Sequence, residues 1–389
     1  MCSMKSLKRP DNPGAIILGG HVQAYGIVRV FGENSIPCIV IDKTRYNIAR
    51  HSRYCSAFYE VGLDELLDYL MELGRNGRYN GWLIMPTDDY HVRLLSRNRK
   101  ELSKHFLVTV DDWDRISLFF NKKSSYPLAR EAGVPVPRTY YPDSRNDLRR
   151  VEAEVDIPCI IKPSVMLDFY RYYKKKVIVC KNQYDLIANF DKATRHICPT
   201  DLMIQEIIPG SSENQYSVGM LYDRDRSCNH LIVRRKRQHP VDFGNATTYA
   251  ETVDIPELKE YAHKILSSAG FFGLCEVEFK YDGRDGQYKF LEVNPRTWKW
   301  HLISQPAGVP FLTSLYSYLT EGTHITSNDY QKAAWRDMVT DIPVILDMMR
   351  KGLYVTGDRR KTVSAVANPK DIKPFLYQLL YLPYLFFNR

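Results

Sequence analysis

Hydrophobic positions in the first ~110 residues alternate between short continuous runs and helical spacing. Runs typical of buried strands occur at residues 15–18, 38–42 and 82–85, and helical spacing occurs at residues 21–31. Strands that alternate with helices predict an open α/β unit of mononucleotide type. The glycine pair in GGHVQAYG begins a turn but lacks the GxGxxG spacing. A dinucleotide site is therefore poorly supported, and packing of a helix on its strand explains the glycines more simply.

From residue 113 onward the pattern changes to one typical of an α+β unit. Residues 119–132 predict a helix that ends at Gly133. The strands predicted after it lie at residues 158–163, 177–180, 203–208, 216–221 and 230–234, followed by a hairpin at 275–296. The remainder, from about residue 308, is predicted to be helical. We therefore expect an N-terminal domain at 1–112, a second domain at 113–320 with lobes of about 113–202 and 203–320, and a C-terminal extension at 321–389.

The stretch CEVEFKYDGRDGQYKFLEVNPR reads as two alternating strands around a turn rich in Asp and Gly. If the turn centres near Asp285, Glu278 lies opposite Glu292, and Glu276 lies opposite Asn294. Carboxylates crowded on one sheet face destabilise it unless a positive charge lies among them. Oxygen ligands from carboxylates and an amide suit Mg²⁺, which usually also binds substrate phosphates. The hairpin therefore predicts a magnesium–nucleotide site.

Two lysines stand where a bound anion would explain them. Lys162 closes an otherwise apolar strand, where a lysine either extends to solvent or contacts an anion. Lys122 lies at the start of a predicted helix, where a cation is unfavourable against the helix dipole unless an anion binds nearby. A solvated surface lysine is the simpler explanation for Lys122 taken alone.

The segment QEIIPG leaves a predicted strand at a Pro-Gly turn. Its backbone groups, free of a neighbouring strand, can contact the edge of an adenine base. Glu213 follows Glu206 by seven residues, where its carboxylate can accept hydrogen bonds from ribose hydroxyls. A plain β-turn is the alternative explanation for this segment.

The run RRKR lies in a predicted strand, so its four side chains cannot all point one way. Alternation puts Arg235 and Arg237 on one face, and Arg234 and Lys236 on the other. One face can contact phosphates while the other is solvated. The alternative is a charged edge strand that resists aggregation.

Pro295-Arg296 follows the acidic strand directly. An arginine beside a cluster of metal-binding carboxylates is suited to a substrate carboxylate or to the charge that develops on a phosphate. Trp298, Trp300 and His301 come next. These three side chains either line a substrate pocket or pack beneath a loop.

Taken in order, these signals resemble the ATP-grasp superfamily over about residues 15–320. The motifs that carry the resemblance are Lys122, IIKP, QEIIPG with Glu213, RRKRQ, EVEF and LEVNPR. The phrases KPSVMLDFYRYYKKKVIV, RKRQHPVDFG and EVNPRTWKWHLISQPAGVPF are similar to predicted carboxylate–amine ligases, a group that includes D-aspartate ligase-like proteins. The resemblance implies a mixed α/β and α+β fold: an N-terminal Rossmann-like pre-ATP-grasp domain, then two lobes that clamp ATP.

The resemblance also implies three groups of site residues. Those expected to bind ATP are Lys122, Lys162, Gln205, Glu206, Ile207, Ile208 and Glu213. Those expected to bind Mg²⁺, with Mn²⁺ as the alternative metal, are Glu278, Glu292 and Asn294. Those expected to be catalytic, because they would stabilise an acyl phosphate, are Arg296 and Arg237. The segment QEIIPG would be the hinge between the two lobes. The loop at residues 164–176, between Lys162 and this hinge, contains no glycine, although this family usually has small residues there.

The reaction implied by the resemblance is the ATP-dependent joining of a carboxylate to an amine through an acyl phosphate, with release of ADP and phosphate. An amino acid or a sugar acid would be a suitable substrate. Two alternatives remain open. One is a nucleotide-binding protein with a regulatory role, and the other is an ATP-grasp enzyme of the carboxylase or kinase type.

Charge and composition narrow the possible partners. The net charge of +9 is compatible with nucleic acid, an anionic membrane surface or anionic small molecules. No nucleic-acid-binding motif accompanies the basic residues, which favours phosphate-bearing small molecules and no nucleic acid. The polar first 14 residues and eight scattered cysteines favour the cytoplasm. We also expect a homo-oligomer.

The C-terminal segment KPFLYQLLYLPYLFFNR combines aromatic and apolar residues with flanking bases. Its longest apolar run, residues 375–387, is too short to span a bilayer. Such segments are typical of membrane interfaces, so peripheral contact with the inner face of the membrane is one hypothesis. A terminal helix that packs on the protein's own surface is the simpler one.

Overall fold

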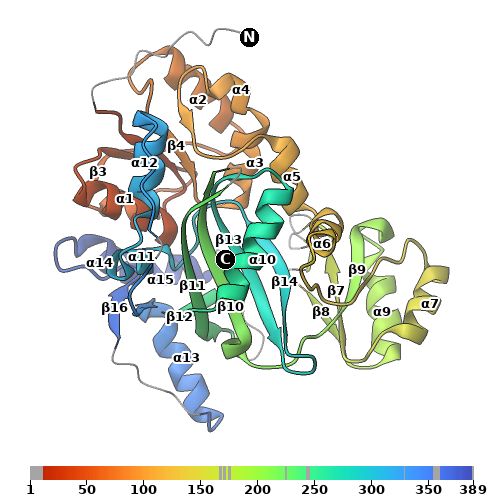
Figure 1. The fold of residues 1–389 in the computed structure, drawn as a ribbon. Coiled ribbons are helices and arrows are strands. Elements are labelled where there is room, and N and C mark those ends of the chain that lie inside the picture. The colour runs from red at the N-terminus through yellow and green to blue at the C-terminus, as the bar shows by residue number, and fades with distance from the viewer. Residues whose placement is uncertain are drawn as a thin grey trace.

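The computed structural model describes residues 12–165, 169, 172–173, 177–223, 226–241, 246–327, 329–353 and 360–387. The chain forms three sheets (Figure 1). The first is parallel, with the order β3-β2-β1-β4-β5. Its strands are β1 (Ala15–Leu18), β2 (Cys38–Asp42), β3 (Cys55–Glu60), β4 (Leu83–Pro86) and β5 (Leu107–Val108). The associated helices are α1 (Val22–Glu33), α2 (Leu66–Arg75), α3 (Asp89–Arg97) and α4 (Arg99–Leu102). The α/β unit expected from the hydrophobic pattern is therefore confirmed.

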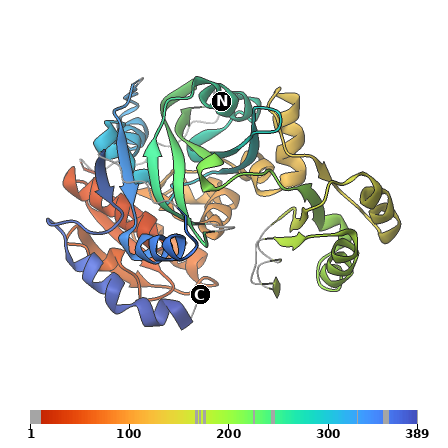
Figure 2. The same ribbon diagram turned by 90° about the horizontal axis from the view of Figure 1, so that it is seen from below.

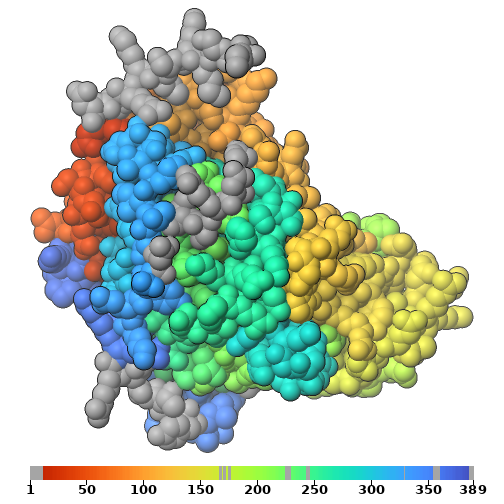
Figure 3. All heavy atoms as spheres, viewed as in Figure 1, coloured from red at the N-terminus to blue at the C-terminus, as the bar shows by residue number. Residues whose placement is uncertain are grey.

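The second sheet forms a smaller lobe that projects from the rest of the molecule (Figures 2 and 3). Its order is β6-β9-β7-β8, and all pairs are antiparallel. The elements of this lobe are β6 (Thr139–Tyr140), α7 (Arg145–Glu154), β7 (Cys159–Pro163), β8 (Ile178–Cys180), α9 (Gln183–Ala193) and β9 (Leu202–Glu206). The lobe has a hydrophobic core of its own, in which Leu148 and Phe190 from the helices pack on Ile161 and Ile204 from the strands.

The third sheet has the order β14-β13-β10-β11-β12-β15-β16 and is antiparallel except for its last pair. Its strands are β10 (Gln215–Asp223), β11 (Arg226–His239), β12 (Ala246–Thr252), β13 (Phe272–Asp282), β14 (Gln287–Asn294), β15 (Ala333–Arg336) and β16 (Lys361–Ser364). The remaining helices are α5 (Trp113–Phe120), α6 (Lys122–Glu131), α10 (Pro256–Ser268), α11 (Ser304–Ala307), α12 (Phe311–Glu321), α13 (Met338–Arg350), α14 (Lys373–Leu380) and α15 (Leu382–Phe387). Short 3₁₀ turns within the described residues are Ala49–His51, Pro199–Asp201, Ser212–Asn214 and His301–Ile303.

The first and third sheets share one core, which the smaller lobe joins through Met203 of β9. One buried cluster contains Ile16 and Ile84 of the first sheet together with Val218 and Val277 of the third. Burial of apolar surface is the main favourable term in folding, so these two sheets stabilise one another. The domain limits at residues 112 and 320 remain predictions.

Two predicted elements differ from the structure. The helix expected at residues 119–132 is two helices, because Asn121 is extended and its side chain accepts a hydrogen bond from the Lys123 amide at 2.9 Å, which caps α6. The C-terminal extension is not wholly helical, because β15 and β16 add two strands to the third sheet. Both strands are only four residues long, too short for alternation to reveal them.

The C-terminal helices pack against the first α/β unit. Tyr377 of α14 stacks on His51 with ring centroids 3.4 Å apart, and Asp371 accepts hydrogen bonds from Ser52 and Arg53. Leu376, Leu380 and nearby apolar side chains remain exposed. Among the described residues, no helix has both the length and the apolar content that a membrane span requires. Membrane contact and oligomerisation remain predictions.

The tryptophans that follow Arg296 belong to the core. Trp298 and Trp300 are 1% and 2% exposed, and Trp298 packs edge-on against Phe311. Gly219 of β10 makes room for this packing, because a Cβ atom there would lie 2.1 Å from the Trp298 ring. Of the two explanations considered for these aromatic residues, the structure supports packing.

Replacing Gly219 with alanine should force the Trp298 ring off the sheet. Overpacking of this kind typically costs about 1–3 kcal/mol of unfolding free energy. Urea unfolding followed by fluorescence would measure it. Gly283→Ala is the matched control, because a Cβ atom at Gly283 would contact nothing within 4 Å. Equal stability of the two variants would contradict the packing argument.

Candidate functional site

The β13–β14 hairpin has the register that its sequence predicts. Glu278 pairs with Glu292, and Glu276 pairs with Asn294. The register shifts by one residue just beyond Glu278, so a bulge separates this acidic end of the hairpin from its turn. The four oxygen-bearing side chains therefore lie next to one another across two strands.

Asn294 links the carboxylates of this group. Its Nδ2 donates hydrogen bonds to Glu276 Oε2 at 3.2 Å and to Glu278 Oε1 at 3.1 Å. Its Oδ1 accepts a hydrogen bond from Arg296 Nη2 at 3.3 Å. The amide thus bridges two acids on one side and the arginine on the other.

Glu276, which was not among the predicted site residues, is held in place at both carboxylate oxygens. Trp300 Nε1 donates a hydrogen bond to Oε1 at 2.8 Å, and Asn294 contacts Oε2. Burial, and then the neighbouring Glu278 carboxylate, raise the pKa of Glu276 to about 7. Arg235 and Arg296 act against this rise in the pKa of Glu276, so the acidic end of the hairpin lies among cations of the protein itself.

Lys122 comes to the hairpin from the first residue of α6. Its Nζ lies 3.0 Å from Glu292 Oε2, and the side chain is almost fully buried. Burial, the largest single cause, would lower the pKa of Lys122, but Glu292, Tyr126 and Asp89 together outweigh it and the pKa is raised. A buried ammonium is stable only when it is paired, so Glu292 is its counter-ion in this structure.

Lys162, at the end of β7, lies close to Lys122. Its Nζ donates a hydrogen bond to the Tyr126 hydroxyl at 2.8 Å. Burial, and then the charge of Lys122, lower the pKa of Lys162 to about 7, although Glu292 opposes this. No carboxylate among the described neighbours fully offsets the effect of burial on Lys162. A bound phosphate would supply that negative charge and favour the ammonium form.

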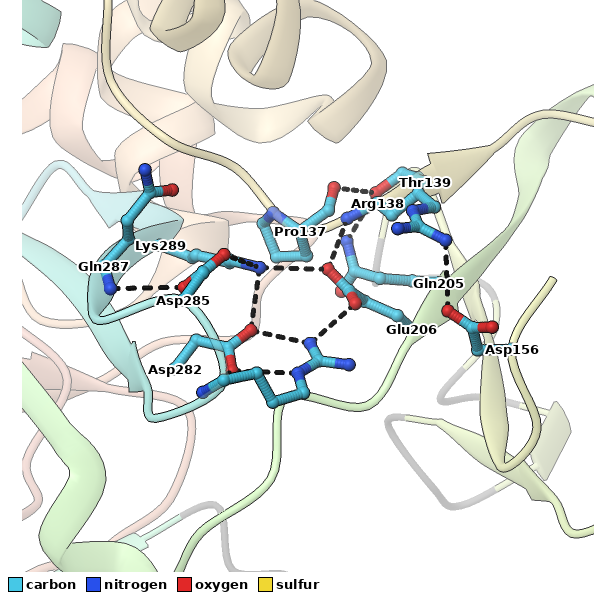
Figure 4. Close-up of polar contacts among 11 residues, drawn as sticks. Pro137, Arg138, Thr139, Asp156, Gln205, Glu206, Asp282, Asp285, Gln287 and Lys289 are labelled. Carbon is cyan, nitrogen blue, oxygen red and sulfur yellow. Dashed lines mark hydrogen bonds and ion pairs between the residues drawn. The ribbon is translucent and has the colours of Figure 1, made fainter.

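The hinge segment joins the smaller lobe to the third sheet through a network of charges (Figure 4). Glu206, at the end of β9, accepts hydrogen bonds from the Arg138 amide at 2.8 Å and from Arg284 Nη2 at 2.7 Å. Arg284 and Lys289 also pair with Asp282, which is fully buried in the turn of the hairpin. The Glu206 carboxylate is thus engaged within the protein, and the Glu206 amide donates a hydrogen bond to the Arg138 carbonyl at 3.1 Å.

The other hinge residues take up distinct positions. Gln205 is buried and donates a hydrogen bond from Nε2 to Thr139 Oγ1 at 2.7 Å. Ile207 is half-buried and Ile208 is buried. Glu213 Oε2 lies 2.8 Å from Lys236 Nζ and 3.3 Å from Arg234 Nη2. Most of the loop at residues 164–176 lies outside the described residues.

Strand β11 places Arg234 and Lys236 together beside Glu213, as alternation predicts. The register shifts between Arg235 and Arg237, so these two side chains do not share one environment. Arg235 Nη2 lies 3.5 Å from Glu278 Oε2. Arg237 instead forms a bidentate ion pair with Asp341 of α13, donating from Nε to Oδ1 at 2.8 Å and from Nη2 to Oδ2 at 2.7 Å. The structure therefore adds Arg235 to the site, and the catalytic role of Arg237 remains a prediction.

Arg296 connects the hairpin to the first α/β unit. Its Nε donates a hydrogen bond to Asp89 Oδ1 at 2.6 Å, at the first residue of α3. Asp89 was not among the predicted site residues. Its position after a buried strand, in the sequence LIMPTDD, was the available signal.

The structure thus brings six of the twelve predicted residues to one place. A continuous set of neighbours runs from Lys162 through Lys122 to Glu292, then across the hairpin to Glu278, Asn294 and Arg296. Within the described part of the chain, no group of three or more His, Cys, Asp or Glu side chains has the geometry of a metal site. The donor set Glu278, Glu292 and Asn294 is instead two carboxylates and an amide, all oxygen ligands, which fits a hard cation such as Mg²⁺.

Comparisons with known proteins agree with this geometry. Residues 121–317 match the family model described as "Carbamoyl-phosphate synthase L chain, ATP binding domain". The chain is 23% identical to the D-aspartate ligase of Enterococcus faecium over 304 residues, which cover 72% of this chain and 70% of that protein.

Two solved structures share the fold. The biotin carboxylase domain of the Hydrogenobacter thermophilus 2-oxoglutarate carboxylase, solved with MgADP and bicarbonate, has a TM-score of 0.64 at 18% identity, covering 82% of this chain and 72% of that one. The L-amino acid ligase of Bacillus licheniformis has a TM-score of 0.62 at 11% identity, covering 80% and 74%. The family match spans more than half of the sequence and includes both lysine-bearing and acidic motifs. The chain therefore belongs to this family of ATP-grasp domains, as the order of its motifs predicted.

Proposed function

We propose that this protein is an ATP-dependent carboxylate–amine ligase that forms an amide bond through an acyl phosphate and releases ADP and phosphate. The observation that carries the proposal is the buried ion pair between Lys122 and Glu292, which lies beside Lys162 and continues into Asn294 and Arg296. The D-aspartate ligase relative supports this reaction class.

The lysines account for binding of the ATP phosphates. Lys122 and Lys162 are buried together, and Glu292 is the carboxylate that acts on both of them. Phosphate oxygens would supply the missing negative charge and replace Glu292 as the partner of Lys122. Glu292 would then be free to bind a metal ion, so nucleotide and metal would enter by exchange of partners.

Glu278, Glu292 and Asn294 would hold Mg²⁺, with Mn²⁺ as the alternative. When bound, the metal neutralises charge on the phosphates during transfer. Asn294 is already oriented by Arg296, and Glu278 by Asn294 and Arg235. Asn294 and Glu278 are thus held by protein neighbours before a metal binds, whereas Glu292 would exchange Lys122 for the metal.

The hinge and Glu213 account for binding of the nucleoside. Because the Glu206 side chain is engaged by Arg138 and Arg284, the main chain of residues 206–208 would contact the adenine edge. Glu213 would hold the ribose hydroxyls, with Lys236 fixing its carboxylate. Gln205 would position Tyr126 through a side-chain hydrogen bond, and Tyr126 in turn accepts a hydrogen bond from Lys162.

Arg296 would orient the substrate carboxylate for attack on the γ-phosphate and stabilise the acyl phosphate. Asp89 fixes its Nε, and Asn294 and Thr297 accept from its other nitrogens. Phosphoryl transfer depends on positioning and charge neutralisation and needs no side-chain nucleophile. A site made of lysines, arginines and carboxylates is therefore sufficient for the reaction, and an amine substrate completes it by attack on the activated carbonyl.

The first test is a screen for ADP release with pairs of small carboxylates and amines, including amino acids and sugar acids. Hydroxylamine should replace the amine and yield a hydroxamate. ADP release that needs a carboxylate but yields no hydroxamate would contradict the acyl phosphate and favour a kinase-type reaction. ATP binding without turnover on any pair would favour a regulatory nucleotide-binding protein.

Glu292→Gln should lower turnover by about 10²–10³-fold, as expected for loss of one preorganised charged group. The substitution removes both a metal ligand and the counter-ion of Lys122. Steady-state ADP release would measure it, with circular dichroism to confirm folding. Glu131→Gln on α6 is the matched control, because Glu131 is exposed. Full activity of Glu292→Gln would disprove the proposed role.

ATP binding should be coupled to proton uptake above neutral pH. The pKa of Lys162 is about 7 without ligand, so the amine is mostly neutral at pH 8.5. Bound phosphates favour the ammonium form, so binding takes up a proton and the ATP affinity falls as the pH rises above about 7. Calorimetric titration at pH 8.5 in buffers of different ionisation enthalpy would count the protons.

The proton uptake should disappear in Lys162→Met. Lys123→Met is the control, because Lys123 is the neighbouring lysine on α6 and is only loosely paired, 4.0 Å from Asp143. Uptake that is equal in the wild type and Lys162→Met would assign the proton to another group. The absence of uptake in the wild type would contradict the neutral state of Lys162.

A further inference from the structure

A cavity of about 770 Å³ lies between the first α/β unit and the smaller lobe. Arg93 and Arg97 of α3 line one side, with Trp113 of α5. The opposite side is formed by residues of the smaller lobe, including His196. Asn121 and Ser124, which flank Lys122 in the chain, also line it.

The strand register places this cavity beyond the phosphate end of the proposed ATP site. Strands β7 and β9 are antiparallel, with Cys159 opposite Glu206 and Lys162 opposite Met203. Moving along β9 from the hinge residue Glu206 therefore leads past Lys162 to Asp201, which lines the cavity. A group that reacts with the terminal phosphate of ATP would lie at the Lys162 end of the ATP site. The cavity therefore adjoins the place where the substrate carboxylate would react.

Helix α3 links the two places directly. Asp89, at its first residue, holds Arg296, while Arg93 and Arg97 follow at intervals of four residues and so lie on the same helix face. At 1.5 Å per residue, the two arginines begin about 6 and about 12 Å along the helix from Asp89. One helix face thus runs from the arginine of the proposed reaction centre into the cavity.

The two arginines are available for an anion. Among the described residues, neither Arg93 nor Arg97 forms an ion pair, although Arg97 stacks over the Trp113 ring at 4.6 Å. Asp201 is the one acid among the described residues that line the cavity. Unpaired arginines on a concave surface suit a carboxylate or phosphate, which they bind with two hydrogen bonds each.

We propose that this cavity binds a second anionic group on the carboxylate substrate, and that Arg93 and Arg97 are the residues that select it. The proposal rests on the function proposed above for the reacting carboxylate at Arg296. The substrate class is an elongated molecule with its second carboxylate or phosphate about 6–12 Å from the reacting carboxylate, as the spacing along α3 requires. The rings of Tyr172 and His196 stack with their centroids 5.0 Å apart and line the cavity on the side of the smaller lobe.

The test separates binding from turnover. The full chain, saturated with MgADP to fill the nucleotide site, is titrated calorimetrically with α,ω-dicarboxylates and ω-phosphonocarboxylates of increasing length. Monocarboxylates of the same lengths serve as reference ligands. The same compounds are then offered with MgATP and hydroxylamine, and hydroxamate is measured. The variants are Arg93→Gln, Arg97→Gln and the control Arg75→Gln, an exposed arginine at the end of α2.

Dianions that span about 6–12 Å should bind more tightly than monoanions, and each cavity variant should weaken dianion binding about ten- to a hundredfold. Arg75→Gln and monocarboxylate binding should be unaffected. The preferred series then identifies the second anion as carboxylate or phosphate. Equal binding of dianions and monoanions, or dianion binding unchanged in both cavity variants, would overturn the proposal. Selective dianion binding without hydroxamate would support the cavity and contradict the ligase reaction.

Discussion

The arrangement of this protein depends on the burial of charged groups that must find partners. Lys122, Lys162 and Glu276 are each less than 9% exposed, and a buried charge without a partner costs several kcal/mol. The ion pair of Lys122 with Glu292 joins α6, at the entrance to the smaller lobe, to the hairpin of the third sheet. The position of α6 against the hairpin is therefore determined by electrostatics as well as by apolar packing.

The same constraint acts where the smaller lobe meets the rest of the molecule. The lobe has its own hydrophobic core, and beside the apolar contact of Met203 with the shared core its junction with the third sheet is made by polar contacts. Glu206 meets Arg284 there, and Arg284 with its neighbours holds the pKa of Asp282 well below its usual range. A polar junction has directional bonds and little buried apolar area, so it can fix an orientation without the stability of a shared core.

The features that could be predicted from sequence are those set by local geometry. The hairpin register followed from alternation and one turn, because both depend only on residues near Asp285. Lys162 was recognisable because a lysine in an apolar strand is unusual. By contrast, the bulge that separates Arg235 from Arg237 depends on pairing with β12, so alternation within β11 could not show that the two arginines have different partners. Asp89 acquires its role only through Arg296, which lies 207 residues away in the chain.

Helix α3 explains how distant parts of the chain act on one site. Its first residue fixes Arg296, and that arginine orients Asn294, which in turn holds Glu276 and Glu278. The same helix presents Arg93 and Arg97 to the cavity. Because a helix is stiff over two turns, the distance between the cavity and the hairpin is set by the backbone and not by flexible side chains. A substrate that spans both places would therefore be aligned with the phosphate end of the site by the position of α3, through the hydrogen bond between Asp89 and Arg296.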